Sequence, residues 1–185
     1  SISGGAMTLL ATQTASGSST ISFTSGIDDT YDSYVFKFYD IHPANNRAIF
    51  QFQADTGTNT NYNIAATTTY FQSLHKENDG NAALGYNESH DDTQSTSFLN
   101  LTTHNSNDND SATSGNITIY QPSSSVFVKH FISTFNHMYT ETGGDKYSWE
   151  DFKAGYFNTA TALTRFQFKF DSGNFDGVIK LYGVS

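Results

Sequence analysis

Cysteine is absent from this chain of 185 residues, and proline, tryptophan and positive charge are scarce. Without cysteine there are no disulfide bridges and no thiolate metal ligands, which excludes the small secreted scaffolds that depend on bridges. The sequence has 9 Lys and Arg residues against 18 Asp and Glu, a formal net charge of −9. Nucleic-acid affinity rests mostly on clustered positive charge, so we expect no nucleic-acid partner.

Long apolar runs are missing as well. No run approaches the roughly 18 residues that indicate a membrane-spanning helix. The amino-terminal segment SISGGAMTLLATQT has no basic residue ahead of its apolar residues, as a secretory signal peptide would have. We therefore expect neither membrane insertion nor a signal peptide.

Aromatic residues, by contrast, are abundant: 16 Phe and 11 Tyr bring them to 15% of the chain. Charged residues also make up 15%, against about 25% in an average soluble domain. Ser, Thr and Asn together supply about a third of the sequence, and these residues are poor in helix interiors but common in strands and turns. This composition predicts an all-β protein with a substantial core.

Apolar and polar residues alternate with a period of two along most of the chain, as in antiparallel strands with one buried face. The clearest segment is 163–170, where three phenylalanines alternate with Arg165, Gln167 and Lys169. The break at 42–46 separates two such segments and predicts either a hairpin or a crossing between sheets. The predicted strands are 7–14, 19–23, 34–39, 48–53, 67–75, 96–102, 116–121, 126–136, 152–157, 163–170 and 177–184.

A set of about ten to eleven strands predicts one antiparallel β-sandwich domain of jelly-roll type over residues 1–185. We expect at most one or two helical turns in it. One such turn is expected at 148–152, where Ser148 precedes acidic residues as a helix cap does. The predicted core residues are Phe23, Phe36, Phe38, Phe50, Phe52, Phe166, Phe168, Phe170, Ile179 and Leu181.

Segment 126–136 is apolar on both of its predicted faces. Val126, Val128 and Ile132 oppose the phenylalanines at positions 127, 131 and 135. Such a strand is either covered on both sides within one chain, by a second sheet or by the loop 140–149, or it faces a partner chain.

The run 105–110 places an oxygen-bearing side chain at every position, a pattern that calcium favours in tight loops. It lacks the loop glycine and the bidentate glutamate of the helix-loop-helix calcium site, with Asp110 and Asn116 at those positions. We therefore expect no metal to be required for folding and regard a solvated turn as the better interpretation.

No other pattern of catalytic or metal-binding residues is specific. The histidines show neither the His-x-His nor the His-x-x-x-His spacing of zinc sites. Glu141, Glu150 and Asp151 beside Trp149 are the best carboxylate group for a glycosidase, but any acidic chain contains such groups. There is no Gly-x-Ser-x-Gly motif and no phosphate loop. We predict no enzymatic activity, no cofactor and no catalytic or metal site.

Tyrosines in or beside predicted loops could form a shelf for sugar rings, although the edges of a core and subunit contacts use tyrosine more often. The tyrosines in question are Tyr62, Tyr70, Tyr86, Tyr139 and Tyr147.

Three segments resemble a known family. They read LLATQTASGSSTISFTSGIDDTYDSYVFKFY over 9–39, DIHPAN over 40–45 and FQFKFDSGNFDGVIKLYGVS over 166–185. Together they resemble β-sandwich virion proteins of tailed phages, especially phages of marine bacteria. That family has an opening T-x-T-A-S-x-S-A-x-x-x-F-x-S-G-I-D-x-T-Y-D and a closing F-x-F-x-S-G-N-x-x-x-G-x-I-K-L-Y-G. The matching residues are Thr12, Thr14, Ala15, Ser16, Ser18, Phe23, Ser25–Asp28, Thr30–Asp32 and Ile179–Gly183.

The resemblance implies a structural component of a virion, either a head decoration or fibre protein or a tail-associated protein, assembled in the host cytoplasm. Its partners would be copies of itself, most simply in a homotrimer, and other virion proteins such as capsid or tail proteins. The alternative is a carbohydrate-binding, adhesin-like module of a tail fibre that recognises a host surface glycan. The matching motifs are strand and turn sequences, such as Gly26–Thr30 and Ser172–Asn174, and bring no catalytic residue with them.

Overall fold

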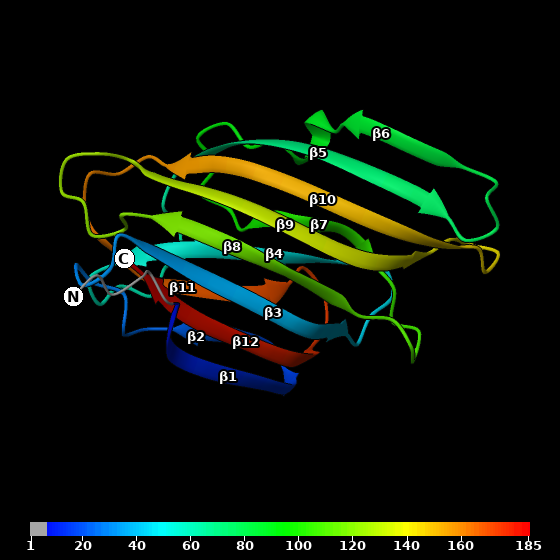
Figure 1. The fold of residues 1–185 in the computed structure, drawn as a ribbon, viewed down its shortest axis with the longest axis horizontal. Helices are drawn as coiled ribbons and strands as arrows, with labels where there is room; N and C mark the ends of the chain where they lie inside the picture. Colours follow the sequence, from blue (N-terminus) through cyan, green and yellow to red (C-terminus); the bar gives the residue numbers. More distant parts are fainter. Residues whose placement is uncertain (1–6) are drawn as a thin grey trace.

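The computed structural model describes residues 7–185 as two antiparallel β-sheets stacked face to face (Figure 1). Residues 1–6 lie outside this range. They belong to the amino-terminal segment for which the sequence predicts no signal peptide. The strands are β1 (Thr8–Ser18), β2 (Ile21–Phe23), β3 (Ser33–Pro43), β4 (Ala48–Thr56), β5 (Ala66–Lys76), β6 (Ala82–Tyr86), β7 (Leu99–Asn105), β8 (Thr113–Tyr120), β9 (Lys129–Thr140), β10 (Lys146–Phe157), β11 (Leu163–Phe170) and β12 (Phe175–Val184). A three-residue 3-10 helix, η1 (Glu88–His90), follows β6.

The large sheet has eight strands in the order β1-β12-β3-β8-β9-β10-β5-β6, and the small sheet has four in the order β2-β11-β4-β7. In Figure 1 the large sheet extends from β1 at the bottom to β6 at the upper right. The predicted all-β antiparallel sandwich is thus confirmed. Within the described range no helix has the length and apolar character needed to cross a membrane.

Alternation along the strands places the predicted residues in the core. Phe166, Phe168 and Phe170 of β11 are buried, while the residues between them are partly exposed. All ten residues predicted for the core are buried, and they belong to one cluster between the sheets. Eight of those ten are phenylalanines, and their rings are arranged mostly edge to face, a favourable geometry for aromatic rings.

The turn chemistry predicted from glycine and aspartate is also present. Gly26 and Gly173 have φ angles of +82° and +77°, in the region that favours glycine. The Asp28 carboxylate accepts a hydrogen bond from the Thr30 N–H at 2.9 Å. The break at 42–46 proves to be a crossing between the sheets, because β3 lies in the large sheet and β4 in the small one.

Three expectations were wrong in detail. Residues 7–185 form twelve strands, one more than predicted, and the additional strand is β6. The turn expected at 148–152 lies within β10, where pairing with β5 on one side and β9 on the other outweighs the local capping pattern. Residues 126–128 form part of a loop, and the strand begins at Lys129. Hence Phe131 and Phe135 are covered by the small sheet, whereas Val126 and Phe127 are exposed.

Candidate binding surface

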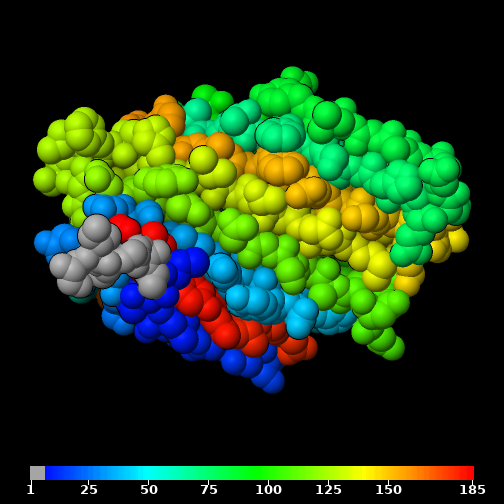
Figure 2. Space-filling view, viewed as in Figure 1, coloured from blue at the N-terminus to red at the C-terminus, as the bar shows by residue number. Residues whose placement is uncertain are grey.

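The outer face of the large sheet, which turns away from the small sheet, carries most of the exposed large apolar side chains of the described residues. Figure 2 shows this face, on which the red band of β12 lies between the blue bands of β1 and β3. Ile132 of β9 points outward because its neighbours Phe131 and Ser133 point into the core, and it is 52% exposed. We call the following residues the apolar band: Phe71, Tyr120, Val126, Phe127, Ile132 and Phe152.

The members of the apolar band are neighbours in space. Phe71 of β5 lies opposite Phe152 of β10, and their rings stack with centroids 4.6 Å apart. A shallow depression lined by both rings and by Ile132 connects this pair to β9. Tyr120 and Phe127 border a further depression beside β9. The band therefore crosses four strands and reaches the loop before β9.

A buried lysine holds that loop in place. The Lys129 ammonium donates hydrogen bonds to the Phe127 carbonyl at 2.7 Å and to the Thr159 carbonyl at 2.9 Å. The Ser124 hydroxyl accepts bonds from the N–H groups of Val126 and Phe127. Among residues 7–185 no carboxylate forms an ion pair with Lys129, and burial lowers its pKa. The exposed Val126 and Phe127 side chains are thus displayed from a fixed backbone, which reduces the entropic cost of binding.

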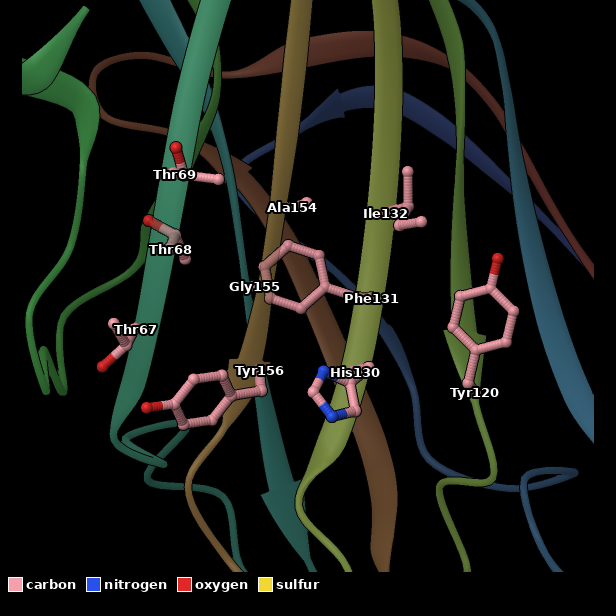
Figure 3. A pocket seen from close by; sticks show the side chains of 10 residues that line it. All are labelled: Thr67, Thr68, Thr69, Tyr120, His130, Phe131, Ile132, Ala154, Gly155 and Tyr156. Carbon is pink, nitrogen blue, oxygen red and sulfur yellow. The ribbon is translucent and has the colours of Figure 1, made fainter.

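At one end of the band the surface is hollowed. The hollow has a volume of about 560 Å³ and is bordered by Tyr156, His130 and Tyr120, which stand in a row on β10, β9 and β8 (Figure 3). Tyr156 and His130 are cross-strand neighbours whose rings meet edge to face at 5.9 Å. Ala154, whose side chain is a single methyl group, leaves the space open.

A network of polar side chains is buried on the opposite, inner side of β10. The Asp151 carboxylate lies 2.9 Å from Nε2 of His137 and accepts a hydrogen bond from the Thr103 N–H at 2.8 Å. The Thr103 hydroxyl contacts the same Nε2 at 3.2 Å. In a catalytic hydroxyl-imidazole-carboxylate triad, the hydroxyl and the carboxylate bind different nitrogens of the imidazole ring, and the hydroxyl faces the substrate. Here all three groups are buried, and they join β7 to β9 and β10.

The second half of this network centres on Lys153, which is fully buried. Its ammonium lies 2.7 Å from the Asp92 carboxylate and donates a hydrogen bond to the His90 carbonyl at 2.8 Å. Burial lowers the pKa of Lys153, and Asp92 opposes this effect. Burial likewise lowers the pKa of His90, and the Lys153 charge adds to this. The network secures the segment after η1 against β10.

Tyr70 completes this network from β5. Its ring lies 5.7 Å from the Lys153 ammonium, and its hydroxyl is buried near the Asp151 and Thr103 side chains. Burial, together with the nearby Asp151 charge, raises the pKa of Tyr70. No sequence motif signalled these contacts, because their members come from β5, β7, β9, β10 and the loop after η1.

The oxygen-rich run 105–110 is occupied by internal contacts. The buried Asn105 side chain donates to the carbonyls of Ala48 and Thr103 and accepts from the Thr113 hydroxyl. The Lys146 ammonium lies 3.2 Å from the Asp110 carboxylate. A lysine thus occupies the place in which a cation would neutralise these oxygens. Among residues 7–185 no group of three or more His, Asp or Glu side chains is arranged to hold a metal ion.

The carboxylates considered for a glycosidase are separated. Glu150 and Asp151 are consecutive on β10, so they point to opposite faces of the large sheet, and Asp151 is buried. Glu141 lies in the turn after β9, where it accepts a hydrogen bond from the Tyr147 hydroxyl at 3.2 Å. These residues do not form a cleft with two facing carboxylates.

Three of the five tyrosines considered for a sugar shelf, Tyr62, Tyr70 and Tyr147, are buried, so these five do not form one. The hollow of about 560 Å³ is bordered instead by Tyr120 and Tyr156, at the ends of β8 and β10. Their outward positions follow from the strand register, which the sequence alone did not determine.

No known protein family has a model that matches this chain, and no curated protein matches it.

Proposed function

We propose that this chain is a non-enzymatic structural component of a tailed-phage virion, either a head decoration or fibre protein or a tail-associated protein. The observation that carries the proposal is the apolar band on the outer face of the large sheet. Monomeric proteins rarely expose contiguous apolar patches larger than a few hundred Å², and larger patches usually mark interaction sites. The sequence resemblance to phage virion proteins supplies the type of particle.

The strand order supports a jelly-roll reading of the sandwich. Strands β1-β12-β3-β8 lie opposite β2-β11-β4-β7, and consecutive strands up to β4 alternate between the two sheets. In this reading two hairpins, β5-β6 and β9-β10, are insertions that widen one sheet of an eight-stranded double Greek key. The inserted strands carry Phe71, Phe152 and Ile132, so they supply half of the apolar band.

We infer that the band is covered by copies of the same chain, most simply around a threefold axis, and by capsid or tail proteins. The rigid loop that presents Val126 and Phe127 suits a permanent contact, since little order is lost on binding. The buried position of the His137 and Asp151 side chains supports a role without catalysis, because substrate cannot reach them.

Ile132→Lys should strongly weaken attachment of the protein to purified capsids or tails, because it places an unpaired charge in the middle of the apolar contact. We expect a loss of at least about 100-fold in affinity, equivalent to about 2.7 kcal/mol. Co-sedimentation with purified particles that lack this protein measures it. Gln167→Lys, on the outer face of the small sheet, is the matched control and should bind normally. Equal binding of both variants would contradict the proposal.

The hollow beside Tyr156 supports a second candidate function, recognition of a host surface glycan by an adhesin-like module of a tail fibre. Sugar rings pack against aromatic faces, and Thr67 and Thr69 border the same hollow with hydroxyl groups. If this is correct, Tyr156→Ala should weaken binding to host glycans at least tenfold in a glycan array or titration. Tyr182→Ala, on β12 of the same face, should not. Absence of glycan binding by the unmodified protein would reject this candidate.

A further inference from the structure

Sheet edges expose unpaired backbone groups, and three of the four edges in the described structure carry features that oppose the addition of another strand. The pairing of β1 with β12 contains two register shifts, and that of β7 with β4 contains one. Strand β2 is only three residues long. Irregular and very short edge strands are common protections against edge-to-edge pairing.

Strand β6, at the other end of the large sheet from β1, has none of these protections. Its sequence Ala-Ala-Leu-Gly-Tyr contains no charge and no proline, and all five residues are exposed. Its pairing with β5 runs without a register shift. On the outer face, Leu84 is 76% exposed, and Tyr86 lies opposite Phe71, so β6 continues the apolar band to the edge of the sheet.

The hydrogen-bond ladder between β5 and β6 determines which backbone groups of β6 are bonded to β5 and which remain unpaired at the edge of the sheet. Just before β6, the Lys76 N–H donates to the Asn81 carbonyl at 2.8 Å, and just after it, the Asn87 N–H donates to the Tyr70 carbonyl at 3.1 Å. Hydrogen-bonded residues alternate along an antiparallel ladder. The odd-numbered residues from 81 to 87 therefore bond to β5.

The even-numbered residues Ala82, Leu84 and Tyr86 consequently direct their N–H and C=O groups to the open edge. These three residues are symmetric about Leu84. An antiparallel copy of the same strand that places Leu84 opposite Leu84 also places Ala82 opposite Tyr86. In this register each open residue exchanges two hydrogen bonds with its counterpart, and a shift of two residues would leave one of the three unpaired on each strand.

We propose that β6 pairs with β6 of a second copy of this chain, centred on Leu84, so that two large sheets become one continuous sheet across a twofold axis. The proposal rests on the proposed function in one respect: on the virion particle, the β6 pair would be a second contact between copies, in addition to the apolar band. The second copy is the best complement of β6 because the unpaired groups, the absence of charge and the Leu84 and Tyr86 side chains all match under the twofold rotation.

The length of β6 sets the strength of this contact. Five residues extend about 17 Å. Two strands of this length bury less surface than a stable interface, which buries about 800 Å² on each partner. The pair should therefore be weak in dilute solution. Copies held side by side by another contact experience effective concentrations in the millimolar range, at which a weak pairing is populated. The proposed edge contact thus joins neighbouring copies on an assembled surface rather than forming a free dimer.

The absence of cysteine allows a register-specific test. In Leu84→Cys the only thiols of two paired copies are directly opposed, about 5.5 Å apart at their Cα atoms. In Ala82→Cys they are offset by four residues, about 14 Å apart. At millimolar protein concentration a short bismaleimide should link Leu84→Cys into covalent dimers at least tenfold faster than Ala82→Cys. A mixture of Ala82→Cys with Tyr86→Cys should give the mixed dimer.

Leu9→Cys, on the exposed edge strand β1, measures the background from random collisions. Cross-linking of Leu84→Cys at the rate of Leu9→Cys, or equal rates for Leu84→Cys and Ala82→Cys, would overturn the pairing. That result leaves the particle-binding test with Ile132→Lys unaffected. Rapid cross-linking of Leu84→Cys in a protein that binds no particle would instead support the pairing and reject the virion function.

Discussion

Replacing Phe168 by alanine should lower the free energy of unfolding by about 3–5 kcal/mol, within the range measured for buried phenylalanines. Phe168 is fully buried on β11 and its ring lies within 6.3 Å, centroid to centroid, of five other phenylalanine rings from both sheets. The substitution removes apolar contacts to all five and leaves a cavity that rigid strands cannot close. Equilibrium denaturation in urea measures the loss.

Gln167→Ala is the matched control for this experiment. Gln167 is the preceding residue on β11, points to the outer face of the small sheet and donates one hydrogen bond to the Ser22 hydroxyl at 2.9 Å. Its loss should cost no more than about 1 kcal/mol. If both variants lost the same stability, the ring cluster would not be the main source of cohesion between the sheets.

Asp92→Ala should destabilise the protein by about 3 kcal/mol, because it leaves the Lys153 ammonium buried without a counter-charge. The remaining hydrogen-bond partner of that ammonium is the neutral His90 carbonyl. In the double variant Asp92→Ala with Lys153→Met neither charge of this ion pair remains, so most of the lost stability should return. A double variant as unstable as Asp92→Ala would show that the pair contributes through packing and not through charge.

This ion pair should also leave a signature in the pH dependence of stability. Burial lowers the pKa of Lys153 below its ordinary value of 10.5. Between the lowered and the ordinary pKa the unfolded chain retains a proton that the folded chain has released, so the free energy of unfolding rises with pH in this window. Asp92→Ala should lower the pKa further and enlarge the rise, and Lys153→Met should remove it.

Tyrosine ionisation limits the range in which this rise can be measured. Burial raises the pKa of Tyr70 above its ordinary value of 10.0. Above about pH 10 the unfolded chain therefore loses that proton first, and stability falls with pH. Thermal melts of the three proteins between about pH 7 and pH 9.5 avoid this effect.

The sequence predicted the central strands well because each has one buried and one exposed face. In β11 the period of two is unambiguous, and the same is true of β3 and β4, so the core phenylalanines could be identified without a structure. Strand β6 was missed for a physical reason: all five of its residues are exposed, and a strand with no buried face has no alternation. Its pairing to β5 depends on the hairpin and not on burial.

The binding surface was only partly predictable. The doubly apolar character of 126–136 correctly drew attention to Ile132, but Val126 and Phe127 precede the strand, and their position depends on the Lys129 contacts across the chain. The hollow at Tyr156 and the buried ion pair of Lys153 combine residues distant in sequence, and their proximity follows from the order of β5, β10 and β9 in the large sheet. Residue spacing along one chain carries no signal for such contacts.

Electron cryomicroscopy of the purified virion, at a resolution that traces this chain, tests the central claim most directly. We expect repeated copies on the head or tail, with Ile132 and Phe127 of each copy buried against a neighbouring copy or against a capsid or tail protein. A reconstruction in which the chain is present but its apolar band faces solvent would contradict the proposed mode of assembly. Absence of the chain from the particle would contradict the virion function itself.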